Sequence, residues 1–270
     1  MKEQWTEEAE AIERQALTAL HQVADEPLRQ ELGLALEPAA DGIASIAAAL
    51  PPTAITINRA LGLGRERPIH ENDIRALVER YRDAGVERFF LQPDPATRDE
   101  EVAPLCEAAG LKRARAWQKF RRGRDEPLPE VETGLPLREV GREDGEAFAA
   151  IVCDAFDLGR VAIPWLARLP ASEGWHAWMA FDGDTPASAG ALFVSGRAAF
   201  TDFGATAPAY RQRGLQAANL ACRVRAAIEL GCERIHSSTG VAVAGDPQHS
   251  YSNIKRCGFV ETHVREAWRP

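Results

Sequence analysis

Apolar residues recur along the chain at helical and strand spacings, and the two kinds of segment alternate. Ala9, Ile12, Ala16, Leu17 and Leu20 mark one face of an opening amphipathic helix that runs to about Ala24. The same patterns and their glycine caps predict helices at 72–84, 98–109, 143–156 and 215–230, and strands at 54–57, 86–91, 117–120, 135–140, 175–181, 187–194, 198–204 and 234–238. This alternation indicates an α/β protein.

One segment in the middle of the chain differs in composition. Residues 121–136, RRGRDEPLPEVETGLP, contain three prolines and charges of both signs, as expected of an exposed linker. We therefore expect two domains, 1–129 and 130–270. Arg121, Arg122 and Arg124 lie beside several acidic residues, which favours a solvated linker over a nucleic-acid patch.

The two halves also resemble each other. YRDAGVERFFLQ in the first half parallels AIELGCERIHSS in the second, and LCEAAGLKRARAWQKF parallels NIKRCGFVETHVREAW. Gly85 matches Gly231, and Gly110 matches Gly258, as helix caps at similar intervals. The alternative is that any two helix–glycine–strand units look alike. A duplicated α/β domain explains the shared order better.

The most informative segment is ATAPAYRQRGLQAA, residues 205–218, between a predicted strand and a predicted helix. Backbone N–H groups in the first turn of a helix lack internal partners, and the helix dipole adds partial positive charge. Arg211 and Arg213 add cationic side chains, and Gly214 permits close approach. The segment is therefore a candidate phosphate-binding turn, but neither a P-loop nor a dinucleotide fingerprint.

With Arg211, Arg213 and Gly214, the preceding aliphatic strand and the Gly258-Phe259 pair, residues 135–270 resemble the acyl-CoA-binding half of the GNAT N-acetyltransferase superfamily. The first half resembles a degenerate copy, because NRALGLG (58–64) stands where the turn would be and lacks flanking cations suited to a pyrophosphate. The resemblance implies two GNAT-like domains of α/β (α+β) class. Each would be a mixed, mostly antiparallel twisted sheet flanked by helices, and only the second would be catalytic.

The resemblance further implies direct transfer of an acetyl group from acetyl-CoA, as co-substrate, to a primary amine of a small molecule or peptide. Its implied cofactor-binding residues are Phe203, Gly204, Ala205 and Thr206 for the pantetheine arm, Arg211, Gln212, Arg213, Gly214, Leu215 and Gln216 for the diphosphate, and Asn253. A backbone N–H near Ala205 would stabilise the oxyanion.

The chain departs from the family pattern at two positions. Gln216 stands where Gly or Ala is usual, and Ile254 stands where the family often places the tyrosine that protonates the leaving thiolate. Tyr251, Ser252 or water would then be the general acid. Candidates for the general base are Asp202, Glu173 and His249.

The remaining composition narrows the class of partner. The formal charge of −8 opposes binding to nucleic acid or to an anionic membrane, so we expect neither partner. We also expect a cytoplasmic protein that is a monomer or a homodimer. Five cysteines without paired spacing predict reduced, mostly buried thiols and no metal site. Trp165, Trp175 and Trp178 are expected in the core, with an acceptor pocket as the alternative. The acceptor is expected in a cleft between the domains. Two other classes of function stay open: an acyl-CoA-binding sensor or assembly subunit, and a purely structural protein.

Overall fold

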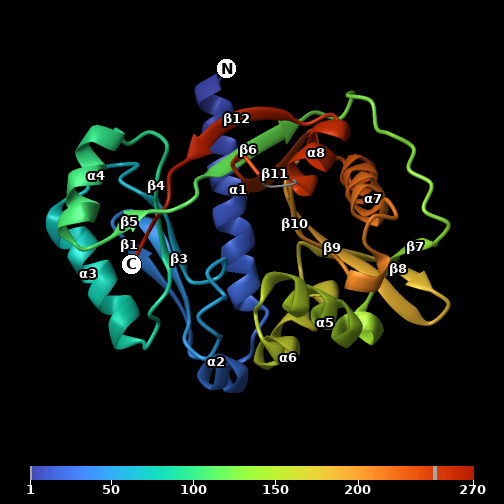
Figure 1. The fold of residues 1–270 in the computed structure, drawn as a ribbon, viewed down its shortest axis with the longest axis horizontal. Helices are drawn as coiled ribbons and strands as arrows, with labels where there is room; N and C mark the ends of the chain where they lie inside the picture. Colours follow the sequence, from blue (N-terminus) through green and yellow to red (C-terminus); the bar gives the residue numbers. More distant parts are fainter. Residues whose placement is uncertain (1, 246–247) are drawn as a thin grey trace.

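The computed structural model describes residues 2–245 and 248–270, and its helices and strands follow the predicted alternation (Figure 1). The first half contains α1 (Lys2–Gln22), α2 (Glu26–Leu32), β1 (Leu34–Ala39), β2 (Gly42–Ala47), β3 (Arg59–Leu63), α3 (Glu71–Asp83), β4 (Phe90–Pro93), α4 (Asp99–Ala108), β5 (Lys112–Arg113) and β6 (Trp117–Arg122). The second half contains β7 (Leu137–Val140), α5 (Gly145–Phe156), α6 (Ile163–Leu166), β8 (Trp175–Asp182), β9 (Thr185–Ser195), β10 (Ala198–Thr206), α7 (Leu215–Glu229), β11 (Arg234–Gly240), α8 (His249–Arg256), β12 (Val260–Arg265) and β13 (Trp268–Arg269).

The prediction was wrong between residues 34 and 64. Residues 54–57 form turns, not a strand, and the strand begins at Arg59, inside the glycine-rich NRALGLG. Asn58 explains the shift, because its side chain accepts a hydrogen bond from the backbone N–H of Ala47 at 2.7 Å and so holds this loop against β2. The hairpin of β1 and β2 lies in the alanine-rich stretch whose loose pattern predicted no element.

Two mixed sheets divide the elements. One sheet has the order β1-β2-β3-β4-β13-β5, and the other has the order β12-β6-β11-β10-β9-β8-β7. In each sheet, all neighbouring strands are antiparallel except one central pair, β3 with β4 and β10 with β11. The expected mixed, mostly antiparallel sheets flanked by helices are therefore confirmed.

The order of elements repeats between the halves, with β1, β2, β3, α3, β4 and α4 matched by β8, β9, β10, α7, β11 and α8. Gly85, Gly110, Gly231 and Gly258, the four caps that the repeat predicted, all have positive φ angles between 75° and 85°. Each half then sends one strand into the other sheet. The first half contributes β6, between β11 and β12, and the second half contributes β13, between β4 and β5.

This exchange crosses the expected boundary at residues 129 and 130. The segment 123–136 contains no helix or strand, as the linker composition predicts, but β6 lies before it and belongs to the second sheet. Arg122 is therefore not a solvated linker residue as expected. It is 1% exposed and its guanidinium donates to the backbone carbonyls of Gly123, Glu126 and Cys257.

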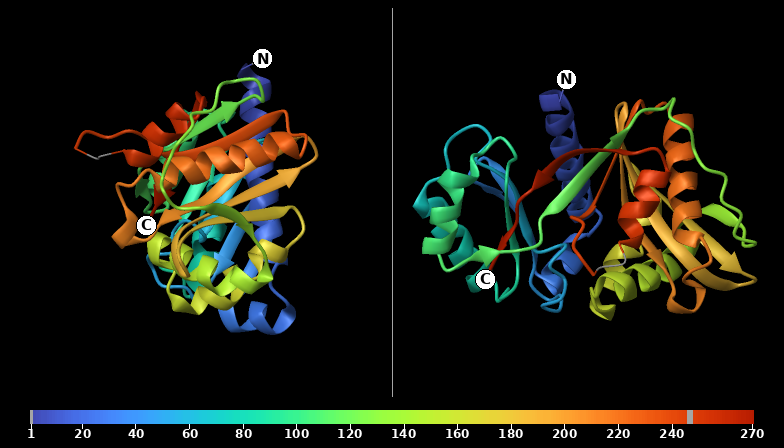
Figure 2. Two further views of the ribbon diagram at one scale, coloured as in Figure 1. Left: turned by 90° about the vertical axis from the view of Figure 1, so that its right-hand side faces the viewer. Right: turned by 45° about the horizontal axis from the view of Figure 1, so that its top comes forward.

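Helices cover both sheets, and α1 lies between them (Figures 1 and 2). One hydrophobic core lies under α3 and α4, a second under α7 and α8, and a third joins α1, α2, α5 and α6 between the sheets. All five predicted apolar positions of α1, from Ala9 to Leu20, are buried in this arrangement. The cavity described below opens beside α1.

Candidate functional site

The site begins where β10 and β11 separate. These parallel strands pair only through Ala198–Phe200 and 234–236, after which β11 continues against β6 alone. The register of β10 against β9 shifts between Asp202 and Ala205, and Phe203 has a φ of 50°, so β10 carries a bulge at this point. The divergence leaves one edge of β10, over residues 203–206, without a strand partner.

Arg223 of α7 stabilises the bulge through hydrogen bonds to the backbone of β9 and β10. Its Nη1 donates to the carbonyl of Asp202 at 2.8 Å and to that of Ala191 on β9 at 2.9 Å. A Cβ on Gly190 would lie 2.8 Å from this guanidinium carbon, so glycine at that position leaves the room it needs. Burial lowers the pKa of Arg223 to about 10, which leaves it charged at neutral pH.

The backbone of β10 offers hydrogen-bonding groups to the open edge. The N–H of Ala207 donates to Ala187 on β9 at 2.9 Å, and successive backbone groups along a strand point to opposite sides. The N–H and C=O of Thr206 therefore face away from β9. The carbonyl oxygen of Thr206 accepts a hydrogen bond from Nε of Arg211 at 3.5 Å, and its buried hydroxyl has no partner among the described residues.

A groove of about 670 Å³ runs along this edge and over the start of α7. The groove is lined by nine cofactor-binding candidates from the sequence analysis: Gly204, Ala205, Thr206, Arg211, Gln212, Gly214, Leu215, Gln216 and Asn253. Tyr210, His249, Ser250 and Arg256 also line it. Gln212 and Gly214 have positive φ angles of 65° and 77°, so the turn is sharply curved where α7 begins. Such a turn presents backbone N–H groups to an anion.

Two residues of the turn differ from expectation. Arg213 does not line the groove, because its guanidinium stacks on the ring of Tyr210 at 5.1 Å. Leu215 packs into the core and is fully buried, which leaves only its backbone for a ligand. Arg256 of α8 supplies the second cation at the groove instead, and only the fold brings α8 to this place.

Gln216, the departure from the family pattern, turns towards α8. Its Oε1 accepts a hydrogen bond from Asn253 at 2.9 Å, and its Nε2 donates to Ser250 at 2.9 Å. Gln216 thus connects the first turn of α7 to α8. Asn253, which also lines the groove, is held in place by the same bond.

The acid and base candidates lie in different places. Tyr251 donates a hydrogen bond to Glu261 at 2.6 Å and packs edge-on against Phe120. It lines neither the groove nor a second cavity that lies between the two halves of the chain. Ser252 and Glu173 are exposed and line neither cavity. His249 lies on the exposed rim of the groove. Among the candidates for the general base, only Asp202 lines the cavity between the two halves.

Asp202 lines a second cavity, of about 200 Å³, that lies between the two halves of the chain. The first half supplies Glu13, Leu17, Leu20, Thr56, Ile57, Arg59 and Trp117, and the second half supplies Phe156, Asp202, Phe203, Arg223 and Thr239 among others. This cavity shares Phe156, Gly204, Gln216, Ser250 and Asn253 with the groove, so the two adjoin. Burial raises the pKa of the Asp202 carboxyl, while Arg59 and the N–H of Phe203 oppose that rise.

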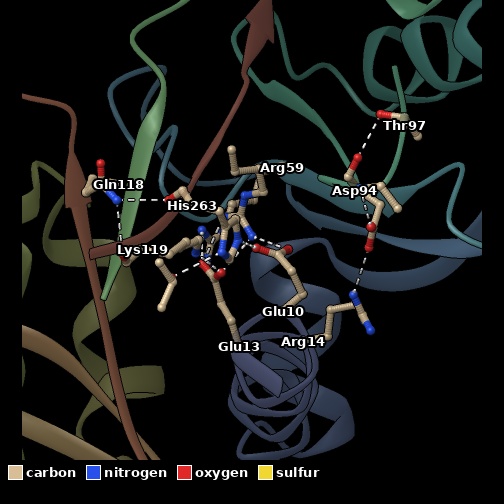
Figure 3. Close-up of polar contacts among 12 residues, drawn as sticks. Glu10, Glu13, Arg14, Arg59, Asp94, Thr97, Gln118, Lys119 and His263 are labelled. Atoms are coloured by element: carbon tan, nitrogen blue, oxygen red, sulfur yellow. Dashed lines mark hydrogen bonds and ion pairs between the residues drawn. The ribbon is translucent and has the colours of Figure 1, made fainter. Parts of the chain in front are cut away.

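A buried network of charged side chains lies beside α1 (Figure 3), and two of its members, Glu13 and Arg59, line this cavity. Glu13 accepts hydrogen bonds from Arg265 of β12 at 2.7 Å and from Arg59 of β3 at 2.9 Å, and it forms an ion pair with Lys119 of β6. Glu10 pairs with Arg265 and His263. Burial acts to raise the pKa of Glu13, but the three cations hold it well below its usual value. Sequence periodicity missed these residues because the polar face of an N-terminal helix is normally solvated.

The equivalent turn in the first half is filled by the chain itself. Asp41, in the β1–β2 hairpin, accepts hydrogen bonds from the backbone N–H groups of Gly64 and Arg67 at 2.8 and 3.2 Å, and from that of Glu66. In addition, β3 and β4 stay paired as far as Leu63 and Pro93 and do not diverge after three residues as β10 and β11 do. A carboxylate occupies the position that an anionic ligand would take, and the strand edge is closed.

The tryptophans and cysteines singled out from the sequence are mostly buried. Trp165, Trp175 and Trp178 are buried in the cores, which confirms packing for them, and Trp117 is the tryptophan at the cavity. All five cysteines are free, four of them buried. Within residues 2–245 and 248–270 there is no cluster of ligands suited to a metal ion, and no helix there has the length and apolar character to cross a bilayer.

Comparison with known proteins identifies the fold. Neither a protein-family model nor a curated protein sequence matches the chain. A GCN5-related N-acetyltransferase from Sphaerobacter thermophilus superposes with a TM-score of 0.60 at 17% identity, covering 98% of this chain and 93% of its own. One from Kribbella flavida gives 0.59 at 16% identity, covering 92% and 94%. A tandem GNAT protein from the clavulanic acid biosynthesis pathway gives 0.54 at 15% identity, covering 78% and 73%. The chain therefore has the fold of the GCN5-related N-acetyltransferases.

Proposed function

We propose that this protein is an N-acetyltransferase that moves an acetyl group from acetyl-CoA to a primary amine. The observation that carries the proposal is the junction of the groove with the cavity between the halves, at Gly204, Gln216 and Ser250. A thioester lying along β10 would end at this junction, and an amine in the cavity would meet it there. The fold, shared with acetyltransferases, supports the same activity.

The residues support direct transfer in a ternary complex. The amine nitrogen attacks the thioester carbonyl carbon, a C–N bond forms, and the C–S bond breaks as the electron pair leaves with sulfur. The N–H of Thr206, on the open edge of β10, would stabilise the oxyanion. Asp202 would take the proton from the ammonium, because a raised pKa brings a carboxylate closer to the basicity of an amine.

The leaving thiolate needs a proton from a group other than Tyr251. The hydroxyl of Ser250 lines both the groove and the cavity, and no other hydroxyl among the described residues lines both, so Ser250 would be the donor, with water as the alternative. Arg211, Arg256 and the N–H groups at the start of α7 would hold the diphosphate.

We assign this activity to the second half, 130–270, with the first half, 1–129, as a non-catalytic copy. Two features of the first half support that division. The Asp41 carboxylate binds backbone N–H groups of the loop that corresponds to the turn before α7, and β4 pairs along the edge of β3 that corresponds to the open edge of β10. The first half still contributes Glu13, Thr56 and Arg59 to the cavity and would shape the acceptor site.

Titration calorimetry with acetyl-CoA tests the proposal. We expect one site per chain, lost in an Arg211→Ala, Gly214→Glu double variant and retained in Arg225→Ala, which changes an exposed residue of the same helix. CoA release with an amine panel then tests transfer, and Asp202→Asn should lower kcat by at least tenfold with little change in acetyl-CoA affinity. Absence of binding in the unaltered protein would overturn the proposal.

One observation favours a second function. Ile254 is buried and Tyr251 faces Glu261, so the thiolate-protonating tyrosine usual in the family has no counterpart at the groove. A protein that binds acyl-CoA without turnover would have the same groove. Acetyl-CoA binding without CoA release from any amine would identify that function.

A further inference from the structure

We infer that the acceptor is a small apolar α-amino acid, bound as a zwitterion in the cavity between the two halves. This inference rests on the proposed transferase function for its catalytic consequence, but it concerns a binding site that can be tested alone. It comes from the unpaired polar groups, the charge and the size of the cavity.

Two residues of the first half that line the cavity, Thr56 and Arg59, each have one buried polar atom without a hydrogen-bond partner among the described residues. Arg59 is 7% exposed, and although its Nη1 pairs with Glu13, its buried Nε–H has none. The buried Thr56 hydroxyl also has none. Buried polar groups in native proteins are nearly always paired, and orphans at a cavity indicate a ligand atom. Both groups can donate, so they suit a carboxylate.

The charged side chains that line the cavity are balanced in number. Arg59 and Arg223 stand against Glu13 and Asp202. Because buried charges need partners, a ligand that carries both signs and has no net charge suits this lining better than a lone anion or a lone cation.

The ammonium group of the acceptor would also have a partner in the cavity. Among the described residues Asp202 has no ion-pair partner within 4 Å, and it lies next to Gly204 at the junction with the groove. An ammonium at Asp202 would place its nitrogen beside the thioester. An α-amino acid carries its ammonium and its carboxylate on one carbon, which matches a carboxylate from one half of the chain facing donors from the other.

The remaining lining mixes apolar residues with the hydroxyls of Thr201, Ser238 and Thr239, and its apolar part suits a small apolar side chain. Leu17, Leu20, Ile57 and Trp117 line it, and its volume of about 200 Å³ is below the ~300–1,000 Å³ of sites for drug-sized ligands. An amine without a carboxylate would leave Arg59 and Thr56 unpaired, and a peptide amine would place an amide where the anion belongs. Sites built to pair a substrate's polar group reject analogues that lack it.

A matched set of three amines tests the inference: L-leucine, leucinamide and 3-methylbutylamine, which is leucine without its carboxylate. We expect kcat/KM for CoA release to be at least tenfold higher with leucine than with either analogue. Arg59→Lys keeps the charge beside Glu13 but lacks the Nε–H, and Thr56→Val removes the hydroxyl; each should reduce that ratio. The KM for acetyl-CoA should stay unchanged in both variants.

Equal kcat/KM for the three amines would overturn the amino-acid inference and leave the transferase intact. If acetyl-CoA binds but no amine is acetylated, calorimetry of leucine against 3-methylbutylamine on the CoA-loaded protein decides, and equal or absent binding overturns the inference. If acetyl-CoA fails to bind, the proposed function fails. The same calorimetry on the free protein then still tests the amino-acid site.

Discussion

Nη1 of Arg265, near the end of β12, lies 2.7 Å from Oε2 of Glu13, in the first helix, and both side chains are almost completely buried. Glu13 also meets Arg59 and Lys119, so one carboxylate joins α1, β3, β6 and β12. These elements come from both halves of the chain. The carboxylate therefore fixes the position of one half against the other at the wall of the cavity.

Glu13→Gln should strongly destabilise the protein. The substitution leaves three buried cations with one fewer negative charge, and breaking a buried pair typically costs ~3–5 kcal/mol. Urea unfolding should show this loss, whereas Glu7→Gln, which breaks an exposed pair with Arg65, should change the free energy of unfolding by less than ~1 kcal/mol. Equal effects would mean that the network is not the connection between the halves.

Arg223→Met should loosen the bulge of β10. The carbonyls of Ala191 and Asp202 would lose their donor, and hydrogen bonds to charged groups are each worth ~1.5–3 kcal/mol. We expect the free energy of unfolding to fall by about 3–6 kcal/mol and the affinity for acetyl-CoA to fall with it. Arg225→Met, an exposed change two residues away, provides the baseline. A stable variant with unaltered affinity would contradict a bracing role.

His236 should make the protein less stable in mild acid. Burial lowers its pKa from 6.5 to about 3, and neither ring nitrogen has a partner in the part of the chain that the structure describes. Below pH 6.5 the unfolded chain binds a proton that the native state does not, so stability falls as the pH falls from about 6.5 towards 3, by up to ~1.4 kcal/mol per pH unit.

Replacing this histidine isolates its contribution. The difference in unfolding free energy between His236→Leu and the unaltered protein should grow in favour of the variant as the pH is lowered from 6.5 to 4.5. His21, whose pKa burial lowers to about 4, contributes in the same direction but cancels in the comparison. A constant difference for His236→Leu would show that the native state protonates it normally.

Asp41→Ala should lower the melting temperature without creating a second acetyl-CoA site. The carboxylate holds three backbone N–H groups of the loop before α3, and their loss of partner should loosen it. The closed β3–β4 edge still excludes a pantetheine strand. Calorimetry should therefore keep a stoichiometry of one per chain. A second site after this change would mean that Asp41 alone blocks the first half.

Much of the architecture could be predicted from local pattern. The apolar stripe of α1, the cap glycines such as Gly85 and Gly231, and the turn before α7 depend on residues close in sequence. The alanine-rich stretch before β3 could not be assigned, because alanine fits helix and strand alike and its strands exist through pairing with distant partners.

The sequence by itself determined the alternation of helices and strands, the repeat of its halves and the sharp turn before α7, because each depends on neighbouring residues. The tertiary structure decided the exchange of β6 and β13, the turning of Tyr251 towards Glu261, the arrival of Arg256 at the groove and the burial of Glu13 among three cations. These depend on which distant segments pack together, and a carboxylate on a helix gives no local sign of whether water or a second sheet will surround it.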